Sequence, residues 1–267
     1  MSKVVLITGA SSGIGKACAV YLAEKGFLVY GTSRKESIED LPFRMIQMDV
    51  TQRHSVEKAI SKIFEEQGRI DVLINNAGMG IGGAAELATE DEISVQMNTN
   101  FTGVVNVTSA VLPFFRQIRK GLIINISSVG GVMGIPYQGF YSASKFAVEG
   151  YSEALSLETN RFGIKVIVVE PGDFHTGFTS SRILSESTQK NNDYRKSFAS
   201  VYDVITEKEI NGCPPQKLAK KIYKIINKKH PGFRYAVGTF DQVLSIYLKR
   251  LIPYNWFRKI LMMYYKM

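Results

Sequence analysis

The stretch that decides the fold reads Lys3-Val-Val-Leu-Ile-Thr8-Gly-Ala-Ser-Ser-Gly-Ile-Gly15. Its first six residues form a short, almost continuously apolar run, which is typical of a parallel strand that is covered on both faces. A glycine-rich turn follows, and a helical pattern then extends from about Gly13 to Lys25. A strand, a glycine turn and a helix in this order are the context that a dinucleotide-binding motif requires.

The glycine turn predicts a phosphate site. Glycines let the backbone approach a pyrophosphate closely, and the amino end of a helix supplies free N–H donors and a favourable dipole. The spacing differs from the usual G-x-G-x-x-G, and such a turn alone is a weak signal. We expect a bound dinucleotide to contact the turn at Gly9, Ser11, Ser12, Gly13, Ile14 and Gly15.

The alternation of strands and helices continues along the chain. Strands are predicted at 27–32, 44–48, 70–75, 121–126 and 164–170, with helices at about 55–67 and 89–120 and around 141–145. Such alternation implies right-handed βαβ units. The predicted fold is therefore α/β, a single-domain Rossmann-type doubly wound parallel sheet with helices on both faces and a C-terminal helical extension.

The pattern changes after Pro171. Residues 177–211 are polar and aperiodic apart from weak helical stretches, which predicts a mobile substrate loop over an active site. A basic helix at 214–229 and a strand at 234–237 complete the predicted domain, residues 1–238. The remainder, 239–267, is interpreted as a basic amphipathic extension packed on that domain. Its apolar positions are Val243, Ile246, Tyr247 and Leu251 and, on one side of a second helix after Pro253, Phe257, Ile260, Leu261 and Tyr264.

Length and composition fit one large domain, because 267 residues with 45% hydrophobic side chains can bury a sizeable core. No stretch approaches the roughly 18 consecutive apolar residues of a transmembrane helix, and the run from Val4 to Ile7 is too short for a signal-peptide core. Cys18 and Cys213 suggest neither a disulfide framework nor a metal cluster. We therefore expect a cytoplasmic protein and no metal site.

Positive charge is concentrated at the carboxyl end of the chain. Residues 210–267 contain twelve Lys and Arg against the single acid Asp241, whereas the rest holds 21 basic and 23 acidic residues. The excess fits either a solvated helix face or peripheral contact of the tail with an anionic membrane surface. Nucleic acid is not an expected partner, because no binding motif accompanies the charge.

A second motif, Tyr141-Ser-Ala-Ser-Lys145, carries proton chemistry. Residues four apart share a helix face, so the Lys145 ammonium can lie near the Tyr141 phenol. A cation ~4 Å away at an effective dielectric of ~20 favours the phenolate by roughly 4 kcal/mol, about three pKa units below the usual ~10. We therefore expect a phenol with a pKa near ~7, suited to general acid–base catalysis.

Four motifs in chain order complete the pattern: the glycine turn, Asn75-Asn-Ala-Gly78, a serine ahead of Tyr141-x-x-x-Lys145, and Pro171-Gly172. Over roughly residues 3–176 the sequence resembles a short-chain dehydrogenase/reductase of the non-extended type. The tail more weakly resembles hydroxysteroid and retinol dehydrogenases of that family. The resemblance implies reversible hydride transfer between a nicotinamide cofactor and a ketone or secondary alcohol.

The resemblance also implies catalytic roles. Ser128 lies thirteen residues before Tyr141, the family spacing for the serine that hydrogen-bonds the substrate oxygen. Ser127 is the alternative, but its side chain should point to the other side of the strand end. Tyr141 would exchange the proton, Lys145 would hold the nicotinamide ribose, and Asn100 would hold a water beside the lysine. Asn98 lies two residues earlier, so the sequence leaves open which of the two asparagines matches the family position.

Cofactor choice depends on the end of the second predicted strand. An acid there grips the ribose of NAD, whereas an arginine accommodates the 2′-phosphate of NADP. This chain has Arg34 and no acid, which favours NADP(H), although Arg34 could be a solvated loop charge. Asp49 and Val50 match the adenine contact, but Asp49 could instead cap a helix.

The remaining cofactor contacts come from the later motifs. By resemblance they are Asn76, Ala77 and Gly78, then Pro171, Gly172 and Thr176, together with Tyr141 and Lys145. His175 matches no catalytic position and is interpreted as a loop or surface histidine.

The regions expected to select the substrate are mostly apolar, which favours a lipophilic ketone or alcohol such as a steroid, retinoid or long-chain compound. They include Met79, Ile81, Val132, Met133, Ile135, Phe140, Phe174 and Phe178. The resemblance further implies a homodimer or homotetramer formed through the helices at about 101–119 and 141–161.

Two other classes are considered. A non-catalytic NADP(H)-binding sensor would need the groove but not the tuned phenol. An extended-type epimerase or dehydratase would need a different glycine spacing and a larger C-terminal domain.

Overall fold

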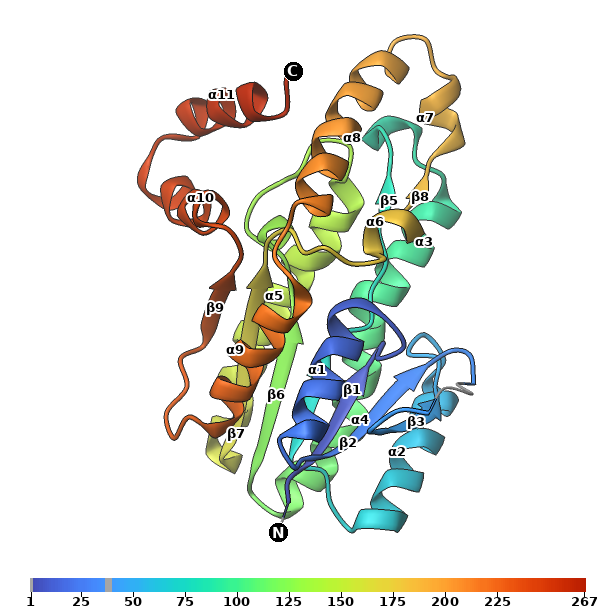
Figure 1. Cartoon of the computed structure of the whole chain (residues 1–267), viewed down its shortest axis with the longest axis vertical. Helices are drawn as coiled ribbons and strands as arrows, with labels where there is room; N and C mark the ends of the chain where they lie inside the picture. Colours follow the sequence, from blue (N-terminus) through green and yellow to red (C-terminus); the bar gives the residue numbers. More distant parts are fainter. Residues whose placement is uncertain (1, 37–39) are drawn as a thin grey trace.

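Seven strands form a central sheet in the order β3-β2-β1-β4-β6-β7-β9, and each pairs in parallel with its neighbours. The computed structural model describes residues 2–36 and 40–267; residues 1 and 37–39, within the predicted domain, lie outside the description. The strands are β1 Val4–Thr8, β2 Leu28–Ser33, β3 Arg44–Gln47, β4 Val72–Asn75, β6 Gly121–Ile126, β7 Ile164–Pro171 and β9 Arg234–Val237. Helices cover both faces of the sheet (Figure 1).

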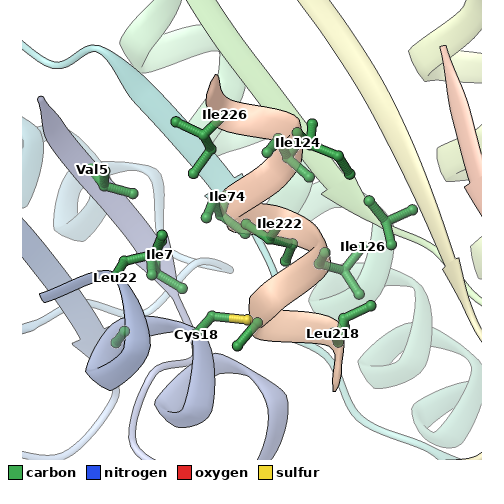
Figure 2. Close-up of a cluster of buried hydrophobic side chains, with 14 of the residues drawn as sticks. Val5, Ile7, Cys18, Leu22, Ile74, Ile124, Ile126, Leu218, Ile222 and Ile226 are labelled. Atoms are coloured by element: carbon green, nitrogen blue, oxygen red, sulfur yellow. The ribbon is translucent and has the colours of Figure 1, made fainter. Parts of the chain in front are cut away.

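One face packs against α1 (Gly13–Glu24) and α9 (Pro215–Asn227). Successive strand side chains alternate between faces, so Val5 and Ile7 of β1 point to this side. Figure 2 shows Ile222 of α9 and its neighbours meeting these strand residues in a buried apolar cluster. This layer fixes α1, and hence the glycine turn, against the sheet.

The opposite face packs against α2 (Arg53–Gln67), α4 (Gly103–Gln117) and α5 (Gly139–Thr159). Val4 and Leu6 point into this second cluster, as the alternation requires. The near-continuous apolar strands expected from the sequence are thus covered on both faces, and the α/β fold prediction is confirmed.

The strand order reverses between β1 and β4, because β1 pairs with β2 on one side and with β4 on the other. In open α/β sheets, ligands bind in the crevice beyond the carboxyl ends of the strands at such a reversal. The glycine turn follows β1 and the Asn75–Gly78 motif follows β4, so both predicted motifs lie at this crevice.

The predicted helix at 89–120 is not continuous. It consists of α3 (Glu90–Met97), a π-helical turn, η2 (Asn98–Thr102), and α4. A capping box of Thr89 and Glu92 begins α3. The π-turn interrupts the regular hydrogen-bond pattern at Asn100, the asparagine that the family resemblance singled out, and such turns are frequent at functional sites.

The segment 177–211 also differs from the prediction of an aperiodic loop. It contains α6 (Phe178–Ser181), β8 (Ile183–Leu184), α7 (Glu186–Lys190) and the long helix α8 (Arg195–Ile210). β8 pairs with the short strand β5 (Ile81–Gly82) in a separate two-stranded sheet. The physical reason is burial: α8 buries Phe198, Val201, Val204 and Ile205. These elements form a cap above the carboxyl edge of the main sheet (Figure 1).

The tail forms two short helices, α10 (Phe240–Leu251) and α11 (Tyr254–Tyr264), separated by Pro253. Ile246 and Phe257 pack with Met133 in a third apolar cluster, which attaches the tail to the loop after β6. Within residues 2–36 and 40–267, no helix combines the length and apolar character needed to cross a bilayer.

Candidate active site

The glycine turn is held in place by the motif after β4. The Asn76 side-chain amide donates hydrogen bonds to the carbonyl oxygens of Thr8 (2.9 Å) and Gly9 (3.0 Å). In return, the Thr8 hydroxyl accepts the backbone N–H groups of Asn76 and Ala77, both at 2.9 Å. These reciprocal bonds tie the carboxyl ends of β1 and β4 together across the crevice.

The turn leaves room for a phosphate group. Gly9 has φ +67°, and a Cβ there would lie 2.8 Å from Cα of Ala77. At Gly15 a Cβ would lie 2.2 Å from the Gly9 carbonyl oxygen. The Ser12 side chain makes no capping hydrogen bond to α1. The first N–H groups of α1 therefore suit an anionic ligand, and the cradle fits the pyrophosphate of a dinucleotide.

Arg34 lies beside the crevice at the end of β2. Together with Thr32 and Ser33 it lines the cavity, and its side chain is exposed. Its carbonyl oxygen accepts a 3.0 Å hydrogen bond from the Gln47 amide of β3. The backbone at Arg34 is therefore anchored, and the exposed side chain lies beside the cavity.

Asp49 follows β3 and also lines the cavity with Val50. Its carboxylate accepts hydrogen bonds from the Thr51 backbone N–H (2.9 Å) and the Thr51 hydroxyl (2.8 Å). Its backbone N–H donates to the Ser55 hydroxyl at 3.0 Å. The side chain thus stabilises the turn before α2, close to the capping role considered from the sequence.

Ser128 and Tyr141 lie together at the carboxyl end of β6. The Ser128 hydroxyl accepts the Gly130 N–H at 3.0 Å, which fixes the loop, and it is hydrogen-bonded to the Tyr141 phenol. The Ser127 side chain instead lies beside Gly131 and beside Glu149 of α5: a Cβ at Gly131 would lie 2.4 Å from its hydroxyl oxygen. Burial raises the pKa of the Glu149 carboxyl, and this hydroxyl opposes the rise. The alternation predicted for the two serines is what the structure shows.

Lys145 and Tyr141 share one face of α5, but their electrostatic relation differs from the expectation. The Lys145 Nζ lies 5.9 Å from the Tyr141 ring centroid. Burial raises the pKa of the Tyr141 phenol above its usual range; the Ser128 hydrogen bond and then the Arg182 charge oppose this increase without reversing it. The prediction of a phenol near ~7 is therefore wrong for this arrangement, because desolvation disfavours the phenolate more than nearby positive charge favours it.

Lys145 itself is buried. Its ammonium donates a 2.9 Å hydrogen bond to the carbonyl oxygen of Ile126 at the end of β6. Burial lowers the pKa of this amine to about 8, and the Glu149 charge only partly offsets the effect. Lys145 can therefore change its charge close to neutral pH.

Asn100 sits inside the π-helical turn and is completely buried. Its side chain accepts the Met79 N–H (2.8 Å) and donates to the Met79 carbonyl oxygen (2.9 Å) and the Ser144 hydroxyl (3.1 Å). A Cβ at Gly78 would lie 3.3 Å from the Asn100 carbonyl oxygen and 3.7 Å from the Lys145 Nζ. Asn100 thus lies beside the lysine.

Asn98, the alternative to Asn100, occupies a different environment. Its side chain is exposed and donates to the Ser94 hydroxyl at 3.0 Å. Asn98 lines the cavity, but of the two asparagines it is Asn100 that lies beside Lys145.

The strand end at Pro171 and Gly172 completes the crevice. A Cβ at Gly13 would lie 3.5 Å from Cβ of Thr176, so the segment after β7 reaches the glycine turn. Asp173, next in the chain, accepts a hydrogen bond from the Gln242 amide of α10, and burial raises its pKa to about 6.

His175 lies apart from these groups. It is exposed, and its ring contacts the Ile210 carbonyl oxygen at 2.6 Å. It belongs to the surface, as the sequence suggested.

A cavity of about 1120 Å³ is lined by the glycine turn, Arg34, Ser128, Tyr141 and Lys145. Its lining includes five of the apolar residues predicted for the substrate region: Met79, Met133, Ile135, Phe174 and Phe178. The other three lie elsewhere. Ile81 pairs with Ile183 between β5 and β8, Val132 packs on the third cluster, and Phe140 is half-buried at the start of α5.

Much of the apolar wall was missed by the sequence reasoning. Helices α8, α10 and α11 contribute Ile205, Leu244, Leu248, Phe257, Ile260, Leu261, Tyr264 and Tyr265. The spacing of Phe257, Ile260, Leu261 and Tyr264 had indicated one apolar side of a helix, and that side faces the cavity. What the spacing could not give was the direction in which the tail folds back.

A buried ion pair in the cap was also missed. The Arg182 guanidinium pairs with the Glu209 carboxylate, and their side chains are 1% and 11% exposed. The Thr179 hydroxyl donates to the same carboxylate at 2.6 Å. Arg182 lies over the rings of Phe178 (5.3 Å) and Tyr202 (5.7 Å). Its positive charge opposes the rise in the pKa of the Tyr141 phenol. The two partners are 27 residues apart, so no local pattern indicates them.

A phenol, a serine hydroxyl and a buried amine beside the crevice at the carboxyl ends of the strands are the arrangement of a Rossmann-fold oxidoreductase. The chain belongs to the short-chain dehydrogenase family, whose family model, described as "short chain dehydrogenase", matches residues 3–186. As a member of that family it is an enzyme that interconverts CH–OH and C=O groups with a nicotinamide cofactor.

Similarity to individual proteins extends beyond the family match. A 3-ketodihydrosphingosine reductase of Bacteroides thetaiotaomicron is 59% identical over 263 residues, with 98% of each chain covered. Human retinol dehydrogenase 8 is 34% identical over 252 residues, which cover 87% of this chain and 80% of the human protein. Among solved structures, a short-chain dehydrogenase from Streptomyces avermitilis superposes with a TM-score of 0.85 at 33% identity, covering 100% of this chain and 97% of the other.

Proposed function

We propose that this enzyme uses NADPH to reduce the ketone of a long-chain 3-keto sphingoid base, as the name of its 59% identical relative states for that protein. The structural observation that supports this proposal is the continuity of the cavity. It extends from Ser128 and Tyr141 to an apolar wall on α10 and α11. A keto group at the polar end and a hydrocarbon chain along the wall match that arrangement.

In this proposal Tyr141 protonates the substrate oxygen while the Ser128 hydroxyl donates a hydrogen bond to it. Because burial raises the pKa of the phenol, Tyr141 remains protonated at neutral pH, as a donor in ketone reduction must be. The nicotinamide, when bound, supplies the hydride that the carbonyl carbon accepts. The balance is one hydride and one proton added to C=O.

Lys145 and Asn100 would support that proton transfer. The Lys145 ammonium would hold the nicotinamide ribose hydroxyls and restore the proton that Tyr141 gives up. Asn100 fixes the loop at Met79 through two hydrogen bonds and lies beside Lys145, where it can orient a water molecule. The π-helical turn makes this orientation possible by directing the Asn100 amide into the site.

The cofactor choice rests on Arg34. Its exposed guanidinium at the end of β2 can pair with a 2′-phosphate, and the carboxylate that would grip a free ribose is not present at that position. The adenosine side of the cofactor would then lie between Arg34 and the Asp49–Val50 turn, with its pyrophosphate on the glycine turn.

A direct test measures NADPH consumption by the purified full-length protein with 3-ketodihydrosphingosine, all-trans-retinal and a steroid ketone, and identifies the products by mass spectrometry. We expect the sphingoid ketone to give the highest kcat/KM. Tyr141→Phe serves as the inactive control. Preferred turnover of retinal, which the similarity to retinol dehydrogenase 8 makes the main competitor, would contradict the substrate assignment while leaving the reaction class intact. Repeating the assay with NADH tests the cofactor, since equal rates would contradict the role of Arg34.

A further inference from the structure

The outer face of α10 carries an exposed apolar stripe, of which Leu244, at the edge of the stripe, also lines the cavity. Phe240, Leu244, Tyr247 and Leu251 follow one another at intervals of four, three and four residues, so they lie on one side of the helix. Their exposed fractions are 82%, 40%, 55% and 79%. The opposite side is anchored by Ile246 in the third apolar cluster. Folding therefore accounts for one side of the helix only.

The second tail helix repeats this feature. Phe257, Ile260, Leu261 and Tyr264 line the cavity, whereas Trp256 and Met263, seven residues apart on another face, are 69% and 76% exposed. Tyr254 at the start of the helix is also 69% exposed. A helix that is apolar well beyond its packed side requires either a buried position or an apolar surface to lie on.

Basic residues accompany the exposed apolar ones. Residues 239–267 contain five Lys and Arg and one acid, Asp241. Arg250, Arg258, Lys259 and Lys266 are exposed, and the Lys259 ammonium lies 5.9 Å from the ring of Trp256. Short helices with Trp, Tyr and Leu beside Lys and Arg have the composition of segments that lie in the plane of a membrane interface.

We propose that the outer faces of α10 and α11 dock on an anionic lipid bilayer. This inference goes beyond the proposed reaction and does not depend on which carbonyl compound is the substrate. A second copy of the chain is the less favourable occupant, because a symmetric contact would bring two such basic surfaces together. The dimer faces implied by the family resemblance lie on α4 and α5, outside residues 239–267.

Docking has a geometric consequence for the cavity. The helices that would rest on the lipid are the same helices whose inner side chains form the apolar wall. A lipophilic molecule dissolved in the bilayer would therefore meet this wall from the membrane side, with little exposure to water.

Trp256 makes the proposal directly measurable, because it is the sole tryptophan of the chain. Full-length protein is mixed with vesicles of phosphatidylcholine and phosphatidylglycerol at 3:1, and with vesicles of phosphatidylcholine alone, in low salt. We expect co-sedimentation and a blue shift of the tryptophan emission with the mixed vesicles, weaker on neutral vesicles and in high salt.

Two matched variants separate docking from misfolding. Phe240→Ser/Leu251→Ser removes two stripe residues that do not line the cavity, and we expect its vesicle partition coefficient to fall by roughly tenfold or more. Leu157→Ser removes a comparably exposed leucine of α5, 76% exposed, and should bind vesicles like the parent. Both should keep the parent's turnover of a short, water-soluble ketone.

Three results would overturn the proposal: no co-sedimentation with anionic vesicles, equal loss in the Leu157→Ser control, or a blue shift that depends on protein concentration without vesicles. The last would identify a second copy as the occupant. Because binding is measured without turnover, its failure is distinguishable from failure of the proposed reaction.

Discussion

The cofactor side and the cap of this enzyme are held together by different means. On the cofactor side, glycines and backbone groups meet at short range, as where Asn76 clamps the carbonyl oxygens of Thr8 and Gly9. In the cap, side chains from helices distant in the sequence surround a cavity and a buried pair, Arg182 and Glu209. The cofactor side is therefore built from short sequence motifs. The cap, which surrounds the substrate cavity, is built from the packing of side chains that are distant in the sequence.

The largest expected effect lies where the two regions meet. Tyr141→Phe removes the proposed proton donor while keeping the ring, whose centroid lies 6.0 Å from that of Phe178. We expect kcat to fall by about 10³-fold, with the NADPH dissociation constant unchanged in a fluorescence titration. Retention of substantial activity would revive the non-catalytic sensor or require another proton donor.

The cap should be most sensitive at its ion pair. Glu209→Gln leaves the Arg182 guanidinium buried without a counter-charge, which typically costs about 3–5 kcal/mol. We expect a lower denaturation midpoint, a higher KM for the substrate and an unchanged affinity for NADPH. As a control, Arg182→Met/Glu209→Leu removes both charges and should recover most of the lost stability. A loss of NADPH affinity equal to the loss of substrate affinity would contradict the separation of the two regions.

The cofactor side should be most sensitive at Gly15. Gly15→Ala places a methyl group 2.2 Å from the Gly9 carbonyl oxygen and 2.4 Å from the Asn76 amide nitrogen. We expect a stability loss of about 1–3 kcal/mol and a marked loss of NADPH binding by calorimetry. Gly150→Ala is the matched control, because a Cβ there meets nothing within 4 Å and should stabilise α5 by ~0.5–1 kcal/mol.

A substitution at Arg34, also on the cofactor side, tests the preference for NADPH over NADH. Arg34→Ala should weaken NADPH binding by about 10-fold to 100-fold, as expected for a lost charge-assisted hydrogen bond of ~1.5–3 kcal/mol, while NADH binding changes little. Arg53→Ala, which removes an exposed arginine paired with Glu57, provides the control. An equal effect on both cofactors would show that Arg34 acts through the fold.

The smallest expected effect is a pH dependence. Burial lowers the pKa of Lys145 to about 8, so the ammonium loses its proton above that pH. If the charged amine supplies the proton relay, kcat for reduction should fall about tenfold for each pH unit above 8. Lys145→Arg keeps its charge in this range, so any residual activity should lack this decline. A decline that persists in this variant would assign the titration to another group.

Local sequence predicted the cofactor side well. The strand Gly121–Ile126 and the strand Arg234–Val237 have the predicted bounds, and α1 ends one residue before the predicted Lys25. These elements are specified by apolar runs and glycines within a few residues of one another, which a pattern can detect. For Ser128 the family spacing made the choice, and strand alternation added that the Ser127 side chain points to the other side.

The cap and the electrostatics could not be predicted in the same way. Helix α8 has apolar residues at 198, 201, 202 and 205, which is a helical spacing. The other residues of the helix are mostly polar, so the apolar periodicity is weak in the sequence. The pKa of Tyr141 depends on how deeply the phenol is buried and on Arg182, which the chain order does not reveal. Burial and long-range pairing are properties of the folded arrangement, so motif spacing alone gave the wrong direction.

The π-helical turn at Asn98–Thr102 adds one residue between α3 and α4 and keeps their side chains aligned. Gln96 before the turn bonds to Met79 and Ile81, and Thr108 after it bonds to Asn75, so both side chains face the same edge. In an uninterrupted helix, twelve residues would separate their directions by ~120°, whereas one additional residue absorbed in the turn reduces this angle to ~20°. Removing a single residue from the turn would leave eleven residues between the two side chains in a regular helix, again ~20° apart, so the π-turn adds a residue to the site without changing the alignment of the flanking helices.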